Sequence, residues 1–263
     1  MTISELHIQL DLQHENRIDI LKDVARKYNE EYLFIDSLDG HCYLFDKNGN
    51  EVDIKKLKKI DHDLFYYSNI ESIVIPDSVK NIENRAFWGC ESLKSIEIPN
   101  SVERIENDIF WKCESLKSII IPDSVKNIGN CTFYRCKSLE SVIIPDSIES
   151  IEDWTFGYCE SLESIVIPDS VKNIRDYAFA WCNNLKSIKM PHSVESIGDW
   201  TFTRCEHLKS IVIPNSVEWI GKFTFESCEN LKSLIFKGKT IDQVKAMKNY
   251  PFGIENESII RCV

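Results

Sequence analysis

Apolar and polar residues follow one pattern along most of this chain, and the pattern repeats every 23 residues. Such self-similarity indicates a solenoid, in which each repeat forms one coil that buries its apolar side against its neighbours. Proline, phenylalanine and cysteine each hold a fixed position in the repeat. These positions are Pro76, Pro99, Pro122, Pro145, Pro168, Pro191 and Pro214; Phe87, Phe110, Phe133, Phe156, Phe179, Phe202 and Phe225; and Cys90, Cys113, Cys136, Cys159, Cys182, Cys205 and Cys228.

A single repeat predicts the path of one coil. Alternating apolar residues from Leu93 to Ile98 predict a short strand that ends at Pro99, which has no N–H to donate. After a turn, a short helical or 3₁₀ segment is expected to carry Phe110 and Cys113 on one face, because they lie three residues apart. Stacking pairs the strands at a spacing of about 4.8 Å. We therefore predict an α+β repeat protein, a right-handed curved leucine-rich repeat solenoid with a parallel sheet on its concave face.

Both ends of the chain depart from the repeat and are expected to cap it, since a terminal coil would otherwise expose its apolar face. Residues 1–50 form either an N-terminal α/β cap or a small separate domain. Residues 51–236 form the solenoid, whose first coil is degenerate and places Tyr67 at the cysteine position. Residues 237–263 form a C-terminal cap. The elements expected in these caps are a strand from Leu6 to Leu12, a helix from Ile18 to Tyr28, a hairpin of Tyr32–Ile35 with Cys42–Phe45, a helix opened by a capping box at Thr240, and a final strand from Ile259 to Val263.

The repeat unit resembles that of the BspA-like, or Treponema pallidum-type, leucine-rich repeat family. The Ile-Pro-x-Ser-Val segment, the Ala-Phe pairs at 86–87 and 178–179 and the seven cysteines carry the resemblance, which extends from about Ile70 to Phe236. It implies a solenoid used for adhesion or other protein binding, commonly on cell surfaces.

The charge of the chain narrows the class of partner. There are 42 acidic residues against 31 Lys and Arg, a formal net charge of -11. An acidic chain repels phosphate backbones and attracts cationic surfaces, so we expect a protein partner and no direct nucleic-acid binding. Met1 to Asn16 hold no apolar signal-peptide core, and no stretch approaches the ~20 residues of a membrane span. The expected location is the cytoplasm, without membrane contact.

Candidate chemistry is sparse. A file of single cysteines cannot converge on one metal ion, and no glycine-rich phosphate loop is present. We therefore expect no metal, no cofactor and no enzymatic activity. An unbroken serine column accompanies the predicted strands, and packing is favoured over a ligand-binding ladder. Its members are Ser72, Ser95, Ser118, Ser141, Ser164, Ser187, Ser210 and Ser233.

Information about a partner should lie at outward positions that vary between repeats. One such position follows each serine by two residues and lies on the predicted concave face. The partner-binding candidates there are Glu97, Ile120, Ile143, Val166, Lys189 and Val212, with Val74 and Ile235 at the ends of the row. The apolar members are explained either by a partner or simply by the preference of sheets for β-branched residues.

Aromatic residues mark a second candidate surface, at the edge of the coils. Two interpretations stay open here, a binding surface rich in aromatic side chains and a stacked ladder that covers the edge. The candidates are Trp154, Tyr158, Tyr177, Trp181 and Trp200, with Phe223 continuing the row and Trp88, Trp111 and Tyr134 preceding it.

The sequence thus predicts a protein-binding module that uses the concave face and the aromatic edge. Two alternatives remain at this point. One is an acidic inhibitor or decoy of a nucleic-acid-handling enzyme, such as a mobile-element inhibitor of a host-defence nuclease. The other, implied by the family, is a surface adhesin.

Overall fold

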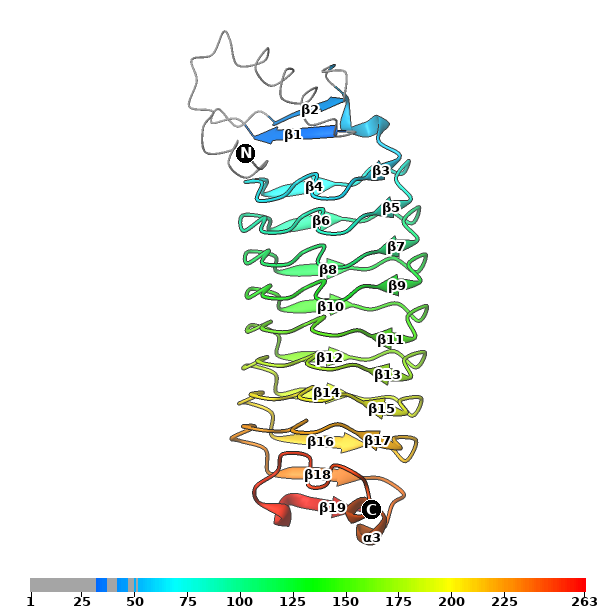
Figure 1. The fold of residues 1–263 in the computed structure, drawn as a ribbon, viewed down its shortest axis with the longest axis vertical. Coiled ribbons are helices and arrows are strands. Elements are labelled where there is room, and N and C mark those ends of the chain that lie inside the picture. The colour runs from blue at the N-terminus through cyan, green and yellow to red at the C-terminus, as the bar shows by residue number, and fades with distance from the viewer. Residues whose placement is uncertain (1–31, 37–41, 47–49, 51) are drawn as a thin grey trace.

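The computed structural model describes residues 32–36, 42–46, 50 and 52–263, and it shows a column of stacked coils (Figure 1). The strand expected from Leu6 to Leu12 and the helix expected from Ile18 to Tyr28 lie outside the described residues. The two strands of the expected hairpin are present, since β1 (Tyr32–Asp36) pairs antiparallel with β2 (Cys42–Asp46). They lie at the N-terminal end of the column.

Each coil contributes two short strands, and the strands of successive coils lie parallel. Equivalent residues pair in register, as in Ser118 with Ser141. The first strands are β4 (Ser72–Val74), β6 (Ser95–Glu97), β8 (Ser118–Ile120), β10 (Ser141–Ile143), β12 (Ser164–Val166), β14 (Ser187–Lys189), β16 (Ser210–Ile213) and β18 (Ser233–Phe236). The second strands are β3 (Lys59–Ile60), β5 (Asn81–Ile82), β7 (Arg104–Ile105), β9 (Asn127–Ile128), β11 (Ser150–Ile151), β13 (Asn173–Ile174), β15 (Ser196–Ile197) and β17 (Trp219–Ile220).

The third side of each coil is built from turns, and the helical or 3₁₀ segment predicted there is absent from the coils that the structure describes. In one coil, Asp108 and Lys112 both adopt left-handed backbone conformations, with φ of 58° each. Such residues end a helical run. The N–H of Phe110 donates instead to the carbonyl of Thr132 in the next coil, at 2.9 Å. Bonds to the next coil thus alternate on this side with bonds inside the coil, such as that from the N–H of Trp111 to the carbonyl of Asp108 at 3.3 Å.

A single apolar core runs through the column. The phenylalanine rings stack from coil to coil, with centroids 5.5 Å apart between Phe110 and Phe133 and 5.3 Å apart between Phe156 and Phe179. All seven of these rings are buried. Because a coil cannot bury these side chains alone, stacking is what stabilises each coil.

The first coil is one residue shorter than the others, which corrects the predicted place of Tyr67. Phe65 stacks on Phe87 at 4.8 Å, and Ile60 pairs with Ile82, both at a separation of 22 residues. Ser68, which is buried, therefore occupies the cysteine position. The missing residue lies between Ser68 and Ile70.

The C-terminal cap has the predicted helix and strand. The helix α3 (Ile241–Lys245) begins with a capping box of Thr240 and Gln243, as expected. The strand β19 (Ile260–Cys262) adds to β18 in parallel and follows the 3₁₀ helix η2 (Glu257–Ile259). A second 3₁₀ helix, η1 (Ile54–Lys56), precedes the first coil. Within the described residues, no helix combines the length and apolar character that a bilayer span requires.

Candidate interaction surface

The outward side of the strands β4 to β18, here called the strand face, carries the first predicted site. Side chains alternate along a strand, so the central residue of each strand points into the core and its neighbours point out. Ile119 is 3% exposed, whereas Ile120 is 65% and Ile143 59% exposed. Val166 reaches 62% and Val212 38%. The structure thus brings the apolar candidates into one row, the apolar row, with the exposed Glu97 and Lys189 on the same face.

A shallow groove of about 480 Å³ lies on this face. The side chains of Glu97, Ile120 and Ile143 line it, together with Ser95 and Ser118. These serines are exposed, and five of the other six serines in the column are exposed as well, while Ser233 is half-buried. They lie on the outer surface of the strands, beside the apolar row. Small side chains beside the apolar row leave the isoleucines standing clear of the surface.

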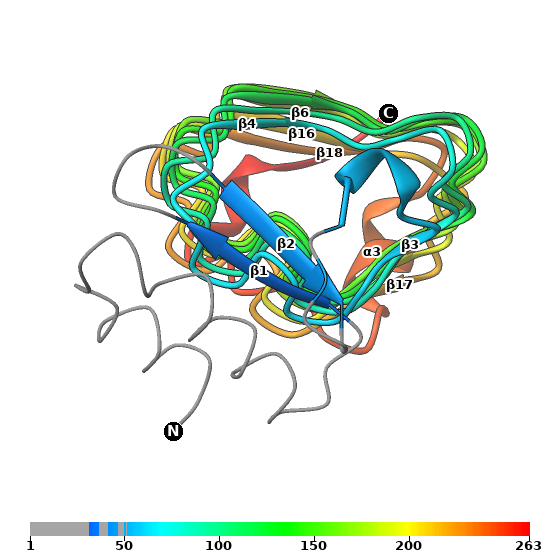
Figure 2. The same ribbon diagram turned by 90° about the horizontal axis from the view of Figure 1, so that it is seen from above.

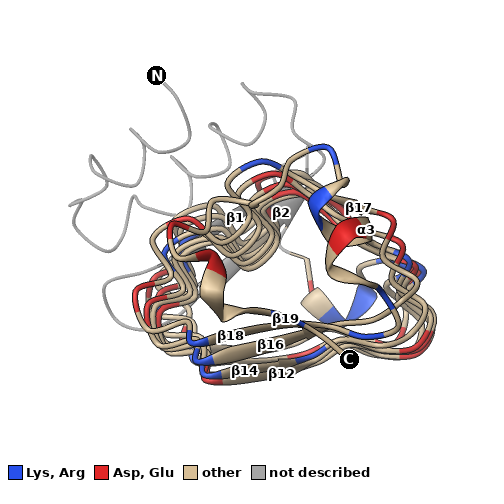
Figure 3. Cartoon of the chain, turned by 90° about the horizontal axis from the view of Figure 1, so that it is seen from below, with Lys and Arg blue, Asp and Glu red and all other residues tan. Residues whose placement is uncertain are grey.

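Acidic residues border the apolar row. Asp123, Asp146 and Asp169 follow the prolines in the coils that hold Ile120, Ile143 and Val166, and all three aspartates are exposed. Asn100 and His192 occupy the same position in the coils of Glu97 and Lys189. Figure 3 shows charged segments at the two corners that flank the sheet, and mainly uncharged strands between them. These aspartates were not among the predicted binding residues, although their constant offset of three residues from the apolar row is visible in the sequence.

The predicted aromatic edge forms two stacked groups that meet edge-on at Tyr134. In the later coils, Trp154 lies 4.2 Å from Tyr177, and Tyr177 lies 5.2 Å from Trp200, with nearly parallel rings. Tyr158 stacks on Trp181 at 4.8 Å. The earlier group runs through Tyr66, Trp88, Trp111 and Tyr134, with Trp88 and Trp111 only 3.9 Å apart. Most ring faces are thus covered by other rings, and none of these residues lines the groove of the strand face.

Cations cover part of the same edge. Arg85 lies over the rings of Tyr66 and Trp88, and Arg135 lies over Tyr134 and Tyr158 at 5.7 and 5.2 Å. Such contacts are typical of stabilising cation–π pairs. The geometry of the edge therefore accounts for its aromatic residues by stacking.

The cysteine column serves the core. The thiol of Cys182 donates to the carbonyl of Phe156 at 3.1 Å, and the other six cysteines make the equivalent bond to the preceding coil. Burial raises the pKa of Cys182 to about 12. A thiol held neutral is a poor nucleophile and a poor metal ligand. No group of residues that could hold a metal ion is found in the described part of the chain.

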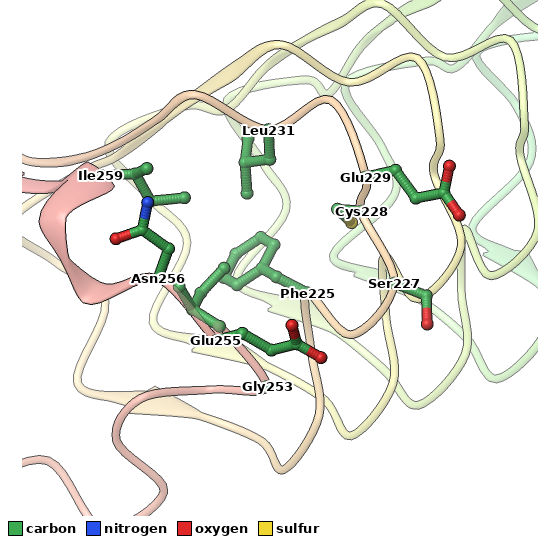
Figure 4. A pocket seen from close by; sticks show the side chains of 10 residues that line it. Phe225, Ser227, Cys228, Glu229, Leu231, Gly253, Glu255, Asn256 and Ile259 are labelled. Atoms are coloured by element: carbon green, nitrogen blue, oxygen red, sulfur yellow. The ribbon is translucent and has the colours of Figure 1, made fainter.

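A second pocket, of about 440 Å³, lies between the last coil and the C-terminal cap (Figure 4). Phe225, Leu231 and Ile259 form its apolar side, and the exposed Glu229 and Glu255 lie at its opening. The pocket occupies the place where a further coil would cover Cys228.

Trp219 is a further exposed aromatic residue, and it was not among the predicted binding residues. It lies in a column otherwise filled by polar residues.

The repeats and the coil architecture are similar to those of known proteins. A family model for the BspA-type leucine-rich repeat region matches residues 58–179 and 150–256. The chain is 24% identical to a leucine-rich repeat protein of Bacteroides ovatus, covering 89% of this chain and 76% of that one, with a TM-score of 0.59. The chain is 26% identical to the leucine-rich repeat protein of Treponema pallidum, with a TM-score of 0.55, and the alignment covers 76% of this chain and 88% of that one.

A third solved structure, a leucine-rich repeat protein of Eubacterium ventriosum, is 21% identical with a TM-score of 0.60. The alignment covers 75% of this chain and 50% of that one. No curated protein sequence matches the chain. The matched structures share the coil architecture described above.

Proposed function

Because the chain belongs to the BspA-type leucine-rich repeat family, we propose that it is a protein-interaction module whose strand face binds another protein. The observation that carries this proposal is the apolar row, in which Ile120, Ile143 and Val166 are each about 60% exposed on successive coils. Contiguous exposed apolar residues with a polar rim mark interaction sites.

The strand position of the row does not by itself require an apolar residue. Glu97 and Lys189 occupy the same position in neighbouring strands of the same length. Polar residues are therefore compatible with the fold at this position. Three consecutive large apolar side chains expose hydrophobic area that a polar residue would not, and a partner that covers them recovers this free energy.

We assign the aromatic edge to stability. Its rings stack on one another across coils, as Tyr177 does on Trp200, so little ring face is left for a partner. We also assign no catalytic step to the chain, since six of its seven repeated thiols are buried and burial raises the pKa of the seventh, Cys228, to about 12. The solved structures that it resembles are described as leucine-rich repeat proteins.

The test is affinity capture from the native host with the full chain, followed by mass spectrometry. Aspartate in place of an apolar side chain of the row removes the apolar contact. We expect the double variant Ile143→Asp with Val166→Asp to lose the specific partner. The matched control, Asn81→Asp with Asn127→Asp, adds the same charge on exposed second-strand positions and keeps the partner. Circular dichroism confirms that both variants fold.

Retention of the partner by a folded strand-face variant contradicts the proposal. Loss of the partner by the control pair, with the strand-face variant unaffected, contradicts it as well and assigns binding to the second strands.

The net charge of -11 favours a second candidate function, an acidic inhibitor or decoy that occupies a cationic groove of a nucleic-acid-handling enzyme. Long-range attraction of this kind weakens as salt screens the charges. The inhibitor or decoy function therefore predicts that the association rate falls steeply between about 0.05 and 0.5 M salt. Association that is insensitive to salt excludes this candidate and leaves the interaction module.

A further inference from the structure

The strand face restricts how a partner can bind. β8 pairs with β10, β12 pairs with β14, and β6 and β12 lie against this first pair from the neighbouring coils (Figure 1), so none of β8, β10 and β12 presents a free edge to which a partner strand could add. A partner must therefore contact side chains on the surface of the sheet. Ile120, Ile143 and Val166 are the side chains that protrude there.

The spacing of the coils selects a helical partner. Phe110, Phe133 and Phe156 are each separated by 5.5 Å between ring centroids, and paired strands lie about 4.8 Å apart. The three coils of the apolar row thus span roughly 10 Å along the column. On an α-helix, residues i, i+3 or i+4, and i+7 form one stripe, and seven residues rise about 10.5 Å.

Extended segments fit this spacing poorly. Side chains on one side of a strand recur about every 6.7 Å, which loses register with the coils after one step. In a polyproline helix the same side recurs about every 9.3 Å, so it would contact every second coil and pass over Ile143.

The charges beside the row indicate the flanks of that helix. Asp123, Asp146 and Asp169 line one side in the same three coils. On the other side, directly before the strand serines, the charges are mixed, because Lys117, Glu140 and Glu163 hold this position and Glu163 pairs with Lys186 at 2.6 Å. The acidic border is therefore the side of the aspartates, and basic residues on the matching flank of an apolar stripe complement it.

We propose that the strand face binds a cationic amphipathic helix that lies along the column axis, with one apolar side chain per coil against Ile120, Ile143 and Val166. This inference rests on the proposed function of the strand face and specifies its partner. The helix packs its apolar stripe on the row and its lysines or arginines beside the border formed by Asp123, Asp146 and Asp169.

The probe is a synthetic helical peptide of about four turns, with leucines at i, i+3 or i+4, and i+7 and lysines on the flank that faces the aspartates. Binding to the full chain is measured by fluorescence anisotropy. A peptide of the same composition in scrambled order is the first control. Single substitutions to aspartate at Ile120, Ile143 and Val166 follow, and we expect each to weaken binding of the ordered peptide by about tenfold or more.

The sign of this effect separates docking from general charge attraction. Each aspartate makes the chain more acidic, so binding by charge alone would become tighter in these variants. Combining Asp123→Asn, Asp146→Asn and Asp169→Asn should weaken binding of the peptide and make this binding less dependent on salt. The control Glu149→Gln, Glu195→Gln and Glu218→Gln removes three exposed charges elsewhere and should change the peptide affinity less.

Three outcomes overturn the proposal. They are equal binding of the scrambled peptide, tighter binding by the aspartate variants, and loss at Ile120 and Val166 without loss at Ile143, which indicates an extended partner. If the peptide fails while Ile143→Asp with Val166→Asp still loses the host partner, the helical partner is wrong and the proposed function stands. If that double variant still captures the host partner, the proposed function fails too.

Discussion

At the scale of single residues, one position holds neighbouring coils together with side-chain oxygens. The amide oxygen of Asn84 accepts the N–H of Asn107 in the next coil at 3.0 Å. Further along, the carboxylate of Asp153 accepts from Asp176, and that of Asp176 accepts from Asp199 at 2.7 Å. The stack therefore places three like charges on successive coils. The pKa of Asp176 is raised, mainly by burial and further by Asp199 and Asp153, although the N–H bond opposes this.

Asp176→Asn is expected to stabilise the protein at pH 7. An amide keeps the acceptor, as Asn84 and Asn107 show, and removes the repulsion. The raised pKa means that the folded state binds the proton more tightly than the unfolded state, so the wild type regains stability as the pH falls toward the ordinary aspartate value. The gain should be a few tenths to about 1 kcal/mol at pH 7 and shrink near pH 4.

Urea unfolding at both pH values measures this change. Glu149→Gln, at an exposed position, serves as the control and should leave the free energy of unfolding nearly unchanged. A variant that is less stable than the wild type at pH 7 would show that the carboxylates are not a cost to the fold.

At the scale of the element, the turn side of each coil depends on two left-handed residues, few of which are glycine. Trp181, Arg204 and Ser227 have φ between 56° and 59° at one such position, where Gly89 has 71°. Left-handed backbone costs a residue with a side chain roughly 1–2 kcal/mol. Stacked side chains and bonds between coils offset that cost in most coils. At Gly89 a Cβ would also lie 2.7 Å from the ring of Tyr67, since the first coil is one residue short.

Opposite substitutions at this position should have opposite effects. We expect Gly89→Ala to destabilise the protein by about 1–2 kcal/mol or more, from backbone strain and the clash with Tyr67. Ser227→Gly relieves the strain in a coil whose side chain is exposed, and should stabilise by up to about 1 kcal/mol. Thermal and urea unfolding of the two variants measure the difference. Equal destabilisation by both would refute the role assigned to the left-handed turns.

At the scale of the whole molecule, stability comes from contacts between adjacent coils. The pairs of strands and the phenylalanine stack connect each coil only to its neighbours, while the hairpin and the C-terminal cap occupy the two ends (Figures 1 and 2). Stability in such a column is close to a sum of coil and interface contributions.

Removal of one whole coil should therefore leave the fold intact. Deletion of residues 122–144 joins Ile121 to Pro145 and keeps every column in register. We expect a folded protein of the same circular dichroism signature with a moderately lower unfolding midpoint. Deletion of residues 123–144, one residue fewer, leaves an extra residue and two consecutive prolines at the turn, and should lower the midpoint further because this coil lies inside the column and must stay aligned with both neighbours. Similar stability of the two deletions would contradict stacking in register.

The sequence by itself determined the period, the inward columns and the outward apolar row, because equal coils repeat equal contacts. The capping box at Thr240 and the two strands of the hairpin were also readable from local patterns. Tyr67 was misplaced because a residue missing from one coil shows only when Phe65 is seen stacked on Phe87. The prediction of a helical segment was wrong because residues such as Asp108 and Lys112 give no local signal of a left-handed turn.

Only the tertiary structure decided what surrounds the apolar row. Asp123 lies three residues after Ile120, directly after a proline, and the turn at the end of the strand places its carboxylate beside the row. The structure likewise separated the aromatic edge from the groove and covered its ring faces with other rings. Burial of the core follows from the type of residue at each position, whereas neighbours on the surface depend on how the chain turns between coils and how closely the coils stack.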